Sequence, residues 1–213
     1  MMSLFSTFNN IIQWKPSPDI FSAGFFHLRW YSLFFAIGFG FGYQMMKRIC
    51  IREGKSTTAL DDLLLYLIAG TVIGARLGHC LFYEFDYYAA HPLKILMVWE
   101  GGLASHGGGV GVLLAIWLFS RKHRDFALFW IFDRVAIFTS LTGAFIRLGN
   151  LMNSEIIGKP TDGTWGFVFL LVDKIPRHPT QIYEAICYAL IAAVGWRIYK
   201  RYASNPPSGL IFG

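Results

Sequence analysis

Charged residues are scarce in this chain. Only 15% of its 213 residues are Asp, Glu, Lys or Arg, whereas a soluble domain carries roughly a quarter. Hydrophobic residues make up 54% and aromatic residues 17%. This balance excludes an ordinary soluble domain and predicts a protein that crosses a membrane several times. The net charge of +6 does not indicate nucleic acid, because the basic residues fall in short clusters between apolar runs.

Cysteines are few, and the sequence shows neither a cleavable leader nor a repeat. Cys50, Cys80 and Cys187 lie far apart in or beside apolar segments. They show no metal-ligand spacing, so each is interpreted as a small packing residue. The N-terminus lacks a basic segment followed by an apolar core and a small-residue cleavage site, which argues against a cleaved signal peptide. We find no internal repeat in the sequence and predict neither a metal nor a cofactor.

Five apolar runs predict an all-α bundle of transmembrane helices. Each run is close to the ~20 residues that cross a bilayer. We expect one membrane domain, residues 1–213, whose parts are an interfacial strap at 1–23, spans at 25–46, 63–82, 103–119, 126–148 and 181–199, a short interfacial piece at 92–99 and an external polar arm at 150–179. Residues 207–213 resemble the start of a sixth span, so we expect the natural protein to continue beyond Gly213.

Basic clusters predict the orientation. They follow the first, third and fifth spans, whereas the loops after the second and fourth spans are mixed in charge. Because short cytoplasmic loops carry an excess of Lys and Arg, the N-terminus and the polar arm are placed outside. The basic residues are Lys47, Arg48, Arg52 and Lys55, then Arg121, Lys122 and Arg124, then Arg197, Lys200 and Arg201.

Arg147 is the most informative polar residue. It ends the fourth apolar run, and a guanidinium stays charged at ordinary pH and is expensive at membrane depth. Asn150, Asn153 and Glu155 follow at close spacing. This pattern places a fixed positive charge and a polar cluster where an anionic lipid headgroup can meet them.

Other ionisable residues also lie at membrane depth. They are Arg29 and Tyr31 at the start of the first span, Arg76 in the second, Asp133 and Arg134 in the fourth, and Glu184 in the fifth. Such residues are functional candidates that usually pair or line a wet cavity. A structural ion pair between Arg76 and Asp133 is an equally good interpretation, and Arg134 near the cytoplasmic end fits simple snorkelling.

Glycines surround His106. Gly101 and Gly102 precede the third span, and a run of three glycines directly follows His106. Glycines permit close approach of backbone or ligand. One interpretation is tight helix packing, and the other is a cavity wall where histidine accepts a proton. The later segment Arg177 to Glu184 fits a helix cap at Thr180 with interfacial anchors.

Several short sequence motifs occur along the chain in a characteristic order. This order resembles the bacterial phosphatidylglycerol–prolipoprotein diacylglyceryl transferase family over nearly the whole chain. The strings are Trp30-Tyr31, Gly74-Ala75-Arg76-Leu77-Gly78, His106-Gly107-Gly108, Arg147-Leu148-Gly149-Asn150 with Asn153, Glu155 and Gly158, Pro160-Thr161 with Trp165-Gly166, and Arg177-His178-Pro179 with Gln181, Tyr183 and Glu184. The stretch from Arg147 to Gly158 is the specific signature, and the other strings are weaker.

The resemblance implies a multi-pass enzyme of the bacterial inner membrane. It moves the diacylglyceryl group of phosphatidylglycerol onto the lipobox cysteine thiol of a prolipoprotein, giving a thioether and glycerol phosphate. The residues that match family positions important for activity are His106, Tyr31, Arg147 and Asn150, with Asn153, Glu155, Gly158 and Arg76 assigned to substrate binding.

This chain also departs from the family pattern. Ile146 and Ala75 stand where the family commonly has glycine, and Leu151 stands where it has phenylalanine. The family's last helices supply a further essential Arg and a Glu beyond the point where this sequence stops. Whether these 213 residues alone are active is therefore left open.

The chemistry suggests a division of roles. A thiolate is the attacking nucleophile, and an arginine fork suits a phosphate leaving group. Arg147 with Asn150 would hold the headgroup, while His106 would accept the thiol proton directly or through Tyr31. Arg76 would add positive potential or pair with Asp133.

Two other functions remain open. A lipid or anion transporter predicts inverted repeats, which the sequence does not show. A non-catalytic membrane homologue would keep the fold without the reaction.

Overall fold

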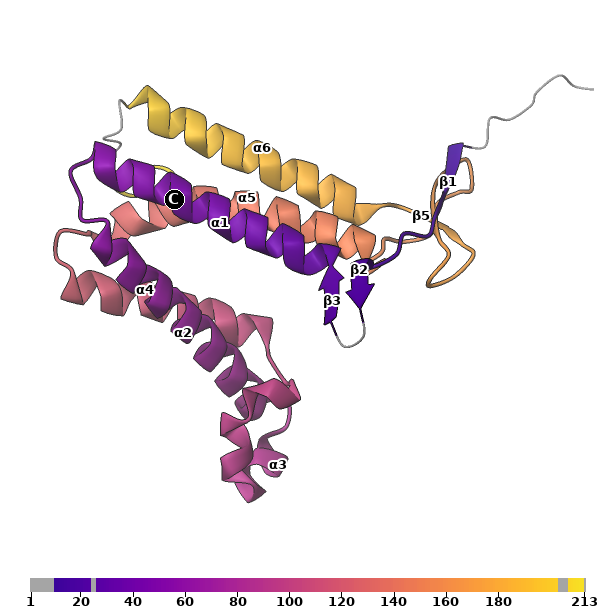
Figure 1. The fold of residues 1–213 in the computed structure, drawn as a ribbon, viewed down its shortest axis with the longest axis horizontal. Coiled ribbons are helices and arrows are strands. Elements are labelled where there is room, and N and C mark those ends of the chain that lie inside the picture. Colours follow the sequence, from indigo (N-terminus) through magenta and orange to yellow (C-terminus); the bar gives the residue numbers. More distant parts are fainter. Residues whose placement is uncertain (1–9, 24–25, 203–206, 213) are drawn as a thin grey trace, which may run out of the picture. The chain divides into compact units, whose positions relative to one another are not determined.

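The computed structural model describes residues 10–23, 26–202 and 207–212, which are mostly helical (Figure 1). The chain forms two compact units. The first comprises Met1–Met45 and Ala136–Lys200, and the second comprises Met46–Val135 and Arg201–Gly213.

Helices occupy all five predicted runs. They are α1 (Trp30–Arg52), α2 (Thr58–Phe82), α4 (Ser105–Lys122), α5 (Leu128–Met152) and α6 (Thr180–Arg201). Three of the described helices, α2, α5 and α6, are long and apolar enough to cross a membrane. Helices α1 and α4 are not among them. The count of five spans therefore stays a prediction.

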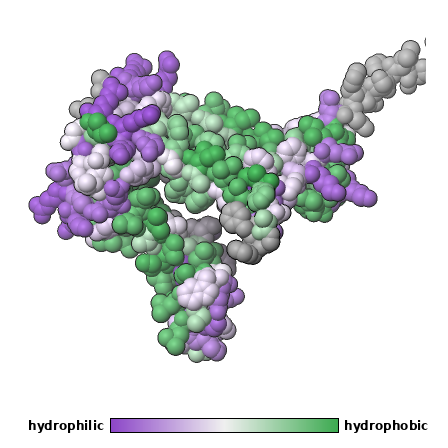
Figure 2. Space-filling view, in the orientation of Figure 1, coloured by the Kyte–Doolittle hydropathy of each residue, from purple (hydrophilic) through white to green (hydrophobic). Residues whose placement is uncertain are grey.

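The helices keep many large apolar side chains on their surfaces, as Figure 2 shows in green. A helix that is hydrophobic around most of its circumference suits a lipid environment. Exposed examples on α2, α4 and α6 are Leu65, Ile68, Ile73, Leu113, Leu114, Ile186, Leu190 and Ile191.

Glycines bring α2 and α4 into backbone contact within the second unit. A Cβ atom built on Gly74 would lie 2.8 Å from the Cα of Gly111, and one built on Gly78 would lie 2.8 Å from the Cα of Gly107. No side chain fits at these distances. Tight packing, one of the two interpretations of the glycine run, is thus confirmed at Gly107 and Gly111.

Small residues also join the helices of the first unit. A Cβ atom on Gly38 of α1 would lie 3.0 Å from the Cγ2 of Thr142 on α5. A Cβ atom on Gly143 of α5 would lie 3.4 Å from the ring of Tyr188 on α6. These contacts place α5 against both α1 and α6.

Short strands supplement the helices, which the all-α prediction does not include. A three-stranded sheet has the order β1-β4-β5, with β1 parallel to β4 and β5 antiparallel to β4, and a separate hairpin pairs β2 with β3. The strands are β1 (Asn10–Trp14), β2 (Asp19–Ala23), β3 (Phe26–Arg29), β4 (Trp165–Phe169) and β5 (Pro176–Arg177). Part of the predicted strap therefore pairs with the polar arm, while residues 1–9 of the strap lie outside the described residues.

The segment between α2 and α4 is irregular. It holds α3 (Phe85–Ala90) and the 3₁₀ turns η1 (Pro92–Leu96) and η2 (Val98–Glu100), which cover the predicted interfacial piece. Gly101 and Gly102 follow with φ of 90° and 71°, in the left-handed region that glycine adopts without a Cβ penalty.

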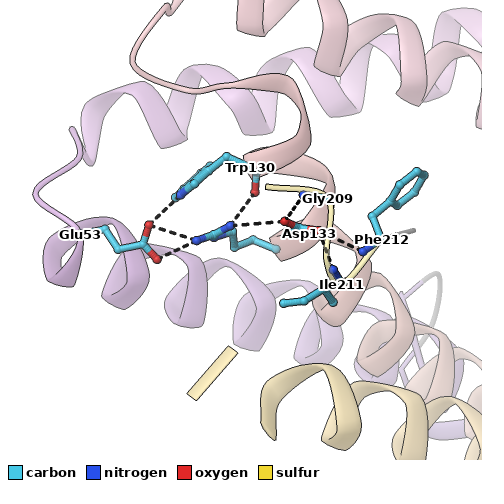
Figure 3. A network of polar contacts seen from close by, with 7 residues as sticks. Glu53, Trp130, Asp133, Gly209, Ile211 and Phe212 are labelled. Atoms are coloured by element: carbon cyan, nitrogen blue, oxygen red, sulfur yellow. Dashed lines mark hydrogen bonds and ion pairs between the residues drawn. The ribbon is translucent and has the colours of Figure 1, made fainter. Parts of the chain in front are cut away.

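Asp133 anchors the described end of the chain (Figure 3). Its fully buried carboxylate accepts backbone N–H bonds from Gly209 at 2.7 Å, Ile211 at 2.9 Å and Phe212 at 3.0 Å. Among the described residues it makes no ion pair with Arg76. The ion-pair interpretation of Arg76 and Asp133 is therefore wrong.

Arg134 is equally buried and pairs with Glu53, whose carboxylate lies 3.0 Å from the guanidinium. The indole N–H of Trp130 donates to the same carboxylate at 2.6 Å (Figure 3). The snorkelling interpretation of Arg134 is wrong, because the charge is neutralised inside the second unit and does not reach the surface.

Candidate functional site

Arg147 and Asn150 lie on one face of the last turns of α5, because residues three apart are neighbours on a helix. The Nη1 of Arg147 donates to the Oδ1 of Asn150 at 3.3 Å. The Nε of Arg147 lies 2.6 Å from a carboxylate oxygen of Glu184 on α6. The Arg147 side chain is 22% exposed and Asn150 is 5% exposed. The charge is thus held from two helices and still reaches the surface.

The network continues into the predicted polar arm. The Nδ2 of Asn150 donates to one oxygen of Glu155 at 3.1 Å, and the Nδ2 of Asn153 donates to the other oxygen at 3.3 Å. Four of the predicted site residues, Arg147, Asn150, Asn153 and Glu155, therefore form one hydrogen-bonded cluster.

The backbone of this turn is strained. Ser154 and Ile156 have φ of 54° and 53°, and a β-branched residue in that region is an outlier. Side chains of α6 hold the turn, because Gln181 donates to the Glu155 carbonyl at 2.6 Å and Thr180 donates to the Ile156 carbonyl at 2.9 Å. Strain of this kind gathers where function demands a fixed geometry. The hydroxyl of Thr180, predicted to cap α6, is used here to hold the turn.

Glycines allow two further close approaches. A Cβ atom on Gly149 would lie 2.9 Å from the Cδ2 of Tyr31, so Tyr31 packs directly against the end of α5. A Cβ atom on Gly158 would lie 2.7 Å from the Cγ2 of Thr180, and the Gly158 N–H donates to the His178 carbonyl at 3.1 Å. Tyr31 and Gly158 thus lie beside the cluster without bonding to Arg147.

The cluster has spare hydrogen-bonding capacity. A guanidinium carries five N–H donors, and among the described residues Arg147 uses them only toward Asn150 and Glu184. Three buried polar atoms, Asn153 Oδ1, Ser154 Oγ and Gln181 Oε1, have no hydrogen-bond partner in the described part of the chain. Buried polar groups are normally satisfied, so each of these three oxygens keeps an unused acceptor position.

An ion pair braces the polar arm beside this cluster. The Nη2 of Arg177 donates to a carboxylate oxygen of Asp173 at 2.6 Å. This hydrogen bond lowers the pKa of Asp173 below its usual range. The same guanidinium donates to the Gly158 carbonyl at 3.3 Å, which ties the arm to the signature turn.

His106 is the second residue of α4, in the other unit. It is exposed and borders an apolar groove of about 1190 Å³ along α2 and α4. Gly74, Leu77, Val110 and Leu114 are among the residues that line the groove. The imidazole therefore lies beside an apolar surface.

Arg76 belongs to the same unit as His106, but its side chain is 3% exposed. It donates to carbonyl groups of the segment that leads into α4. The predicted site residues thus divide between the two units, and a contact of His106 with Tyr31 or with Arg147 stays a prediction.

Glu184 and Gln181 are two site neighbours that sequence reasoning did not assign to the site. The sequence did contain a signal for Glu184, because it is a carboxylate at membrane depth for which no partner had been predicted. Gln181 had only its place in the weaker family string. Their contacts with Arg147 and Glu155 depend on how α5 packs against α6, which no local pattern specifies.

Comparison with known proteins shows the family to which the chain belongs. The family model described as prolipoprotein diacylglyceryl transferase matches residues 18–213. A phosphatidylglycerol–prolipoprotein diacylglyceryl transferase from Tolumonas auensis is 54% identical over 94% of this chain and 77% of that protein. Proteins of the same name from Chloroherpeton thalassium and Porphyromonas gingivalis are 48% and 44% identical, and cover 96% and 95% of this chain and 76% and 75% of their own lengths. The chain belongs to the prolipoprotein diacylglyceryl transferase family.

Proposed function

We propose that this protein transfers the diacylglyceryl group of phosphatidylglycerol to the cysteine thiol of a prolipoprotein. The observation that carries the proposal is the Arg147 cluster, a partly exposed guanidinium with spare donors at the family signature. In the reaction the sulfur attacks the glycerol carbon that carries the phosphate. A C–S bond forms, the C–O bond to phosphate breaks, and glycerol phosphate leaves while the thiol gives up its proton.

The Arg147 cluster suits the phosphatidylglycerol headgroup. The unused N–H donors of Arg147 would bind the phosphate in a charge-assisted, bidentate manner, which neutralises the leaving group as the C–O bond breaks. Asn150 and Glu184 would hold the guanidinium in place.

His106 is the residue that we assign to the thiol proton. Imidazole accepts protons near neutral pH, and the attacking species is the thiolate. The exposed position of His106 at the rim of the α2–α4 groove supports this role, because acyl chains can stay in the groove while the polar reaction proceeds at its edge. Tyr31, packed against Gly149 at the end of α5, is the second candidate for moving that proton.

The proposed site of action is the outer face of a bacterial inner membrane. Five spans with the N-terminus outside place the basic loops in the cytoplasm. The same topology places the signature turn and the polar arm outside, where a prolipoprotein presents its cysteine.

A transfer assay tests the proposal. The protein is placed in vesicles with phosphatidylglycerol labelled in its acyl chains, and a lipobox peptide is supplied. Label should appear on the Cys peptide and not on a matched Ser peptide, and glycerol phosphate should form in equal amount. Movement of lipid without covalent transfer would indicate a transporter, and no reaction in any arm would indicate a non-catalytic homologue.

Two variants separate the assigned roles. Arg147→Gln should lower kcat/KM for phosphatidylglycerol by ~100-fold or more, since loss of one transition-state donor costs about that much. His106→Gln should lower kcat with little change in KM. Near wild-type turnover of His106→Gln would remove the base role.

A further inference from the structure

The Arg76 side chain is saturated by the backbone. Its Nε donates to the carbonyl of Ile95 at 2.9 Å, and its Nη1 and Nη2 donate to the carbonyls of Gly101 and Gly102 and of Lys94 and Met97. A guanidinium carries five N–H donors in a fixed fork. The ring of Tyr88 covers one face, 4.9 Å from the guanidinium carbon. Arg76 therefore has no donor left for a phosphate, in contrast with Arg147.

The carbonyl groups around Arg76 lie at the end of a helical turn. Lys94 and Ile95 lie at the end of η1 and Met97 directly follows it. The carbonyls of Lys94 and Met97 accept backbone N–H bonds from Met97 and Glu100, so the guanidinium gives each of them a second hydrogen bond. A positive charge is favourable at that end. Burial at 3% exposure strengthens the attraction, because little water competes for the carbonyls.

The held segment leads directly to His106. Gly102 has no room for a side chain, because a Cβ atom there would lie 2.7 Å from the ring of His79 and 2.9 Å from the Nη1 of Arg76. Ala104 then donates its N–H to the carbonyl of Ala75, the neighbour of Arg76, at 2.9 Å. Helix α4 begins at Ser105, so Arg76 and its neighbour fix the backbone up to the turn that carries His106.

We infer that Arg76 is a positioning residue, which holds the segment Lys94–Gly102 and thereby sets the place of His106 at the start of α4. It acts through the backbone and does not bind the lipid headgroup. This inference rests on the proposed role of His106 in the transfer reaction.

Arg76→Lys is the decisive variant. Lysine keeps the charge but has three donors on a compact ammonium, so it cannot serve five carbonyls at once. Misplacement of a reacting group by about 1 Å can cost ~100-fold in rate. We expect kcat per folded protein to fall by ~10- to 100-fold, while KM for phosphatidylglycerol changes by less than ~2-fold. A rise in KM with unchanged kcat would overturn the inference and assign Arg76 to the headgroup.

Hydrogen exchange supplies a second measurement that does not need activity. In Arg76→Lys the amides of residues 94–104 should exchange faster, whereas those of the α2–α4 contact should be unchanged. Faster exchange with unchanged kcat would overturn the link to His106, and unchanged exchange would overturn the holding role. If the wild-type protein shows no transfer at all, the proposed function fails, while exchange still decides whether Arg76 holds the segment.

Two further variants keep the inference testable if Arg76→Lys does not fold. Gly102→Ala disturbs the same guanidinium from the other side, and should reproduce the loss of kcat without a rise in KM. Gly109→Ala is the matched control, because a Cβ atom there meets nothing within 4 Å and the position lies in the same helix as His106. Its kcat should equal that of the wild type.

Discussion

The pair between Arg147 and Glu184 sets the direction of the guanidinium. The Nε of Arg147 faces the Glu184 carboxylate at 2.6 Å, and Nη1 faces Asn150 at 3.3 Å. Nη2 and the second N–H of Nη1 are then the donors left for a ligand. A carboxylate at Nε therefore orients the charge without occupying the donor pair that would grip a phosphate.

We predict that Glu184→Gln lowers kcat/KM for phosphatidylglycerol by ~3- to 10-fold. Glutamine keeps an acceptor oxygen but loses the charge attraction, which for a partly exposed pair is worth about 1 kcal/mol. Steady-state kinetics over a range of lipid concentrations measures the change. Asp62→Asn is the control, since Asp62 belongs to the second unit, where it pairs with His123 at 3.1 Å. An unchanged Glu184→Gln enzyme would contradict the orienting role.

The sequence predicts part of this cluster. Arg147 and Asn150 share a helix face by periodicity, and Asn153 and Glu155 follow so closely that contact is expected. Glu184 and Gln181 come from another helix, so their place depends on packing. Arg76 and Arg147 also look alike in sequence, as charges within apolar runs. The structure distinguishes them, because backbone carbonyls occupy the donors of Arg76. Arg147 keeps donors that can bind an anion.

At the scale of elements, the α2–α4 contact depends on glycine. We predict that Gly74→Ala destabilises the protein by about 1–3 kcal/mol, the usual cost of overpacking, because the added Cβ atom would lie 2.8 Å from the Gly111 backbone. Gly109→Ala, whose Cβ atom meets nothing within 4 Å, should be neutral or slightly stabilising, since alanine favours a helix. Thermal unfolding in detergent compares the two, and equal melting temperatures would contradict backbone contact at Gly74.

The ion pair of the polar arm predicts a dependence on pH. Hydrogen bonding from Arg177 lowers the pKa of Asp173 in the folded protein. Its contribution to stability is therefore fully present above the unfolded pKa, near 3.9, and is lost as the pH falls through the lower folded pKa. The melting temperature of Asp173→Asn should lie below that of the wild type at pH 7, and the difference should shrink below about pH 4. A difference that grows in acid would contradict this assignment.

Helices and strands differ in how far the sequence reveals them. Long apolar runs predict all five helices. Within each run the backbone hydrogen bonds are local, and the apolar side chains favour a lipid environment. The strands are short, and β1 pairs with β4 across most of the chain. The stability of β1 and β4 comes from this pairing between distant segments. A local stretch of five residues therefore does not predict either strand. The prolines at positions 16 and 18 do mark the break between β1 and β2.

At the scale of the whole molecule, function requires that the signature turn and the substrate cysteine share one side of the membrane. The basic clusters that follow the first, third and fifth predicted spans favour a cytoplasmic location for those loops. The arm that carries Lys159 then lies outside and the loop that carries Arg124 lies inside. Both residues are exposed and basic, so they form a matched pair for a test of orientation.

We predict that a cysteine at position 159 reacts with a membrane-impermeant maleimide in intact spheroplasts, whereas one at 124 reacts only after the membrane is opened. Lys159→Cys and Arg124→Cys would be made in a background where Cys50, Cys80 and Cys187 are replaced by alanine, because Cys187 is exposed. Labelling of both after lysis controls for accessibility. The reverse pattern would place the Arg147 cluster in the cytoplasm, and labelling of both in intact spheroplasts would contradict an odd number of spans between these two positions.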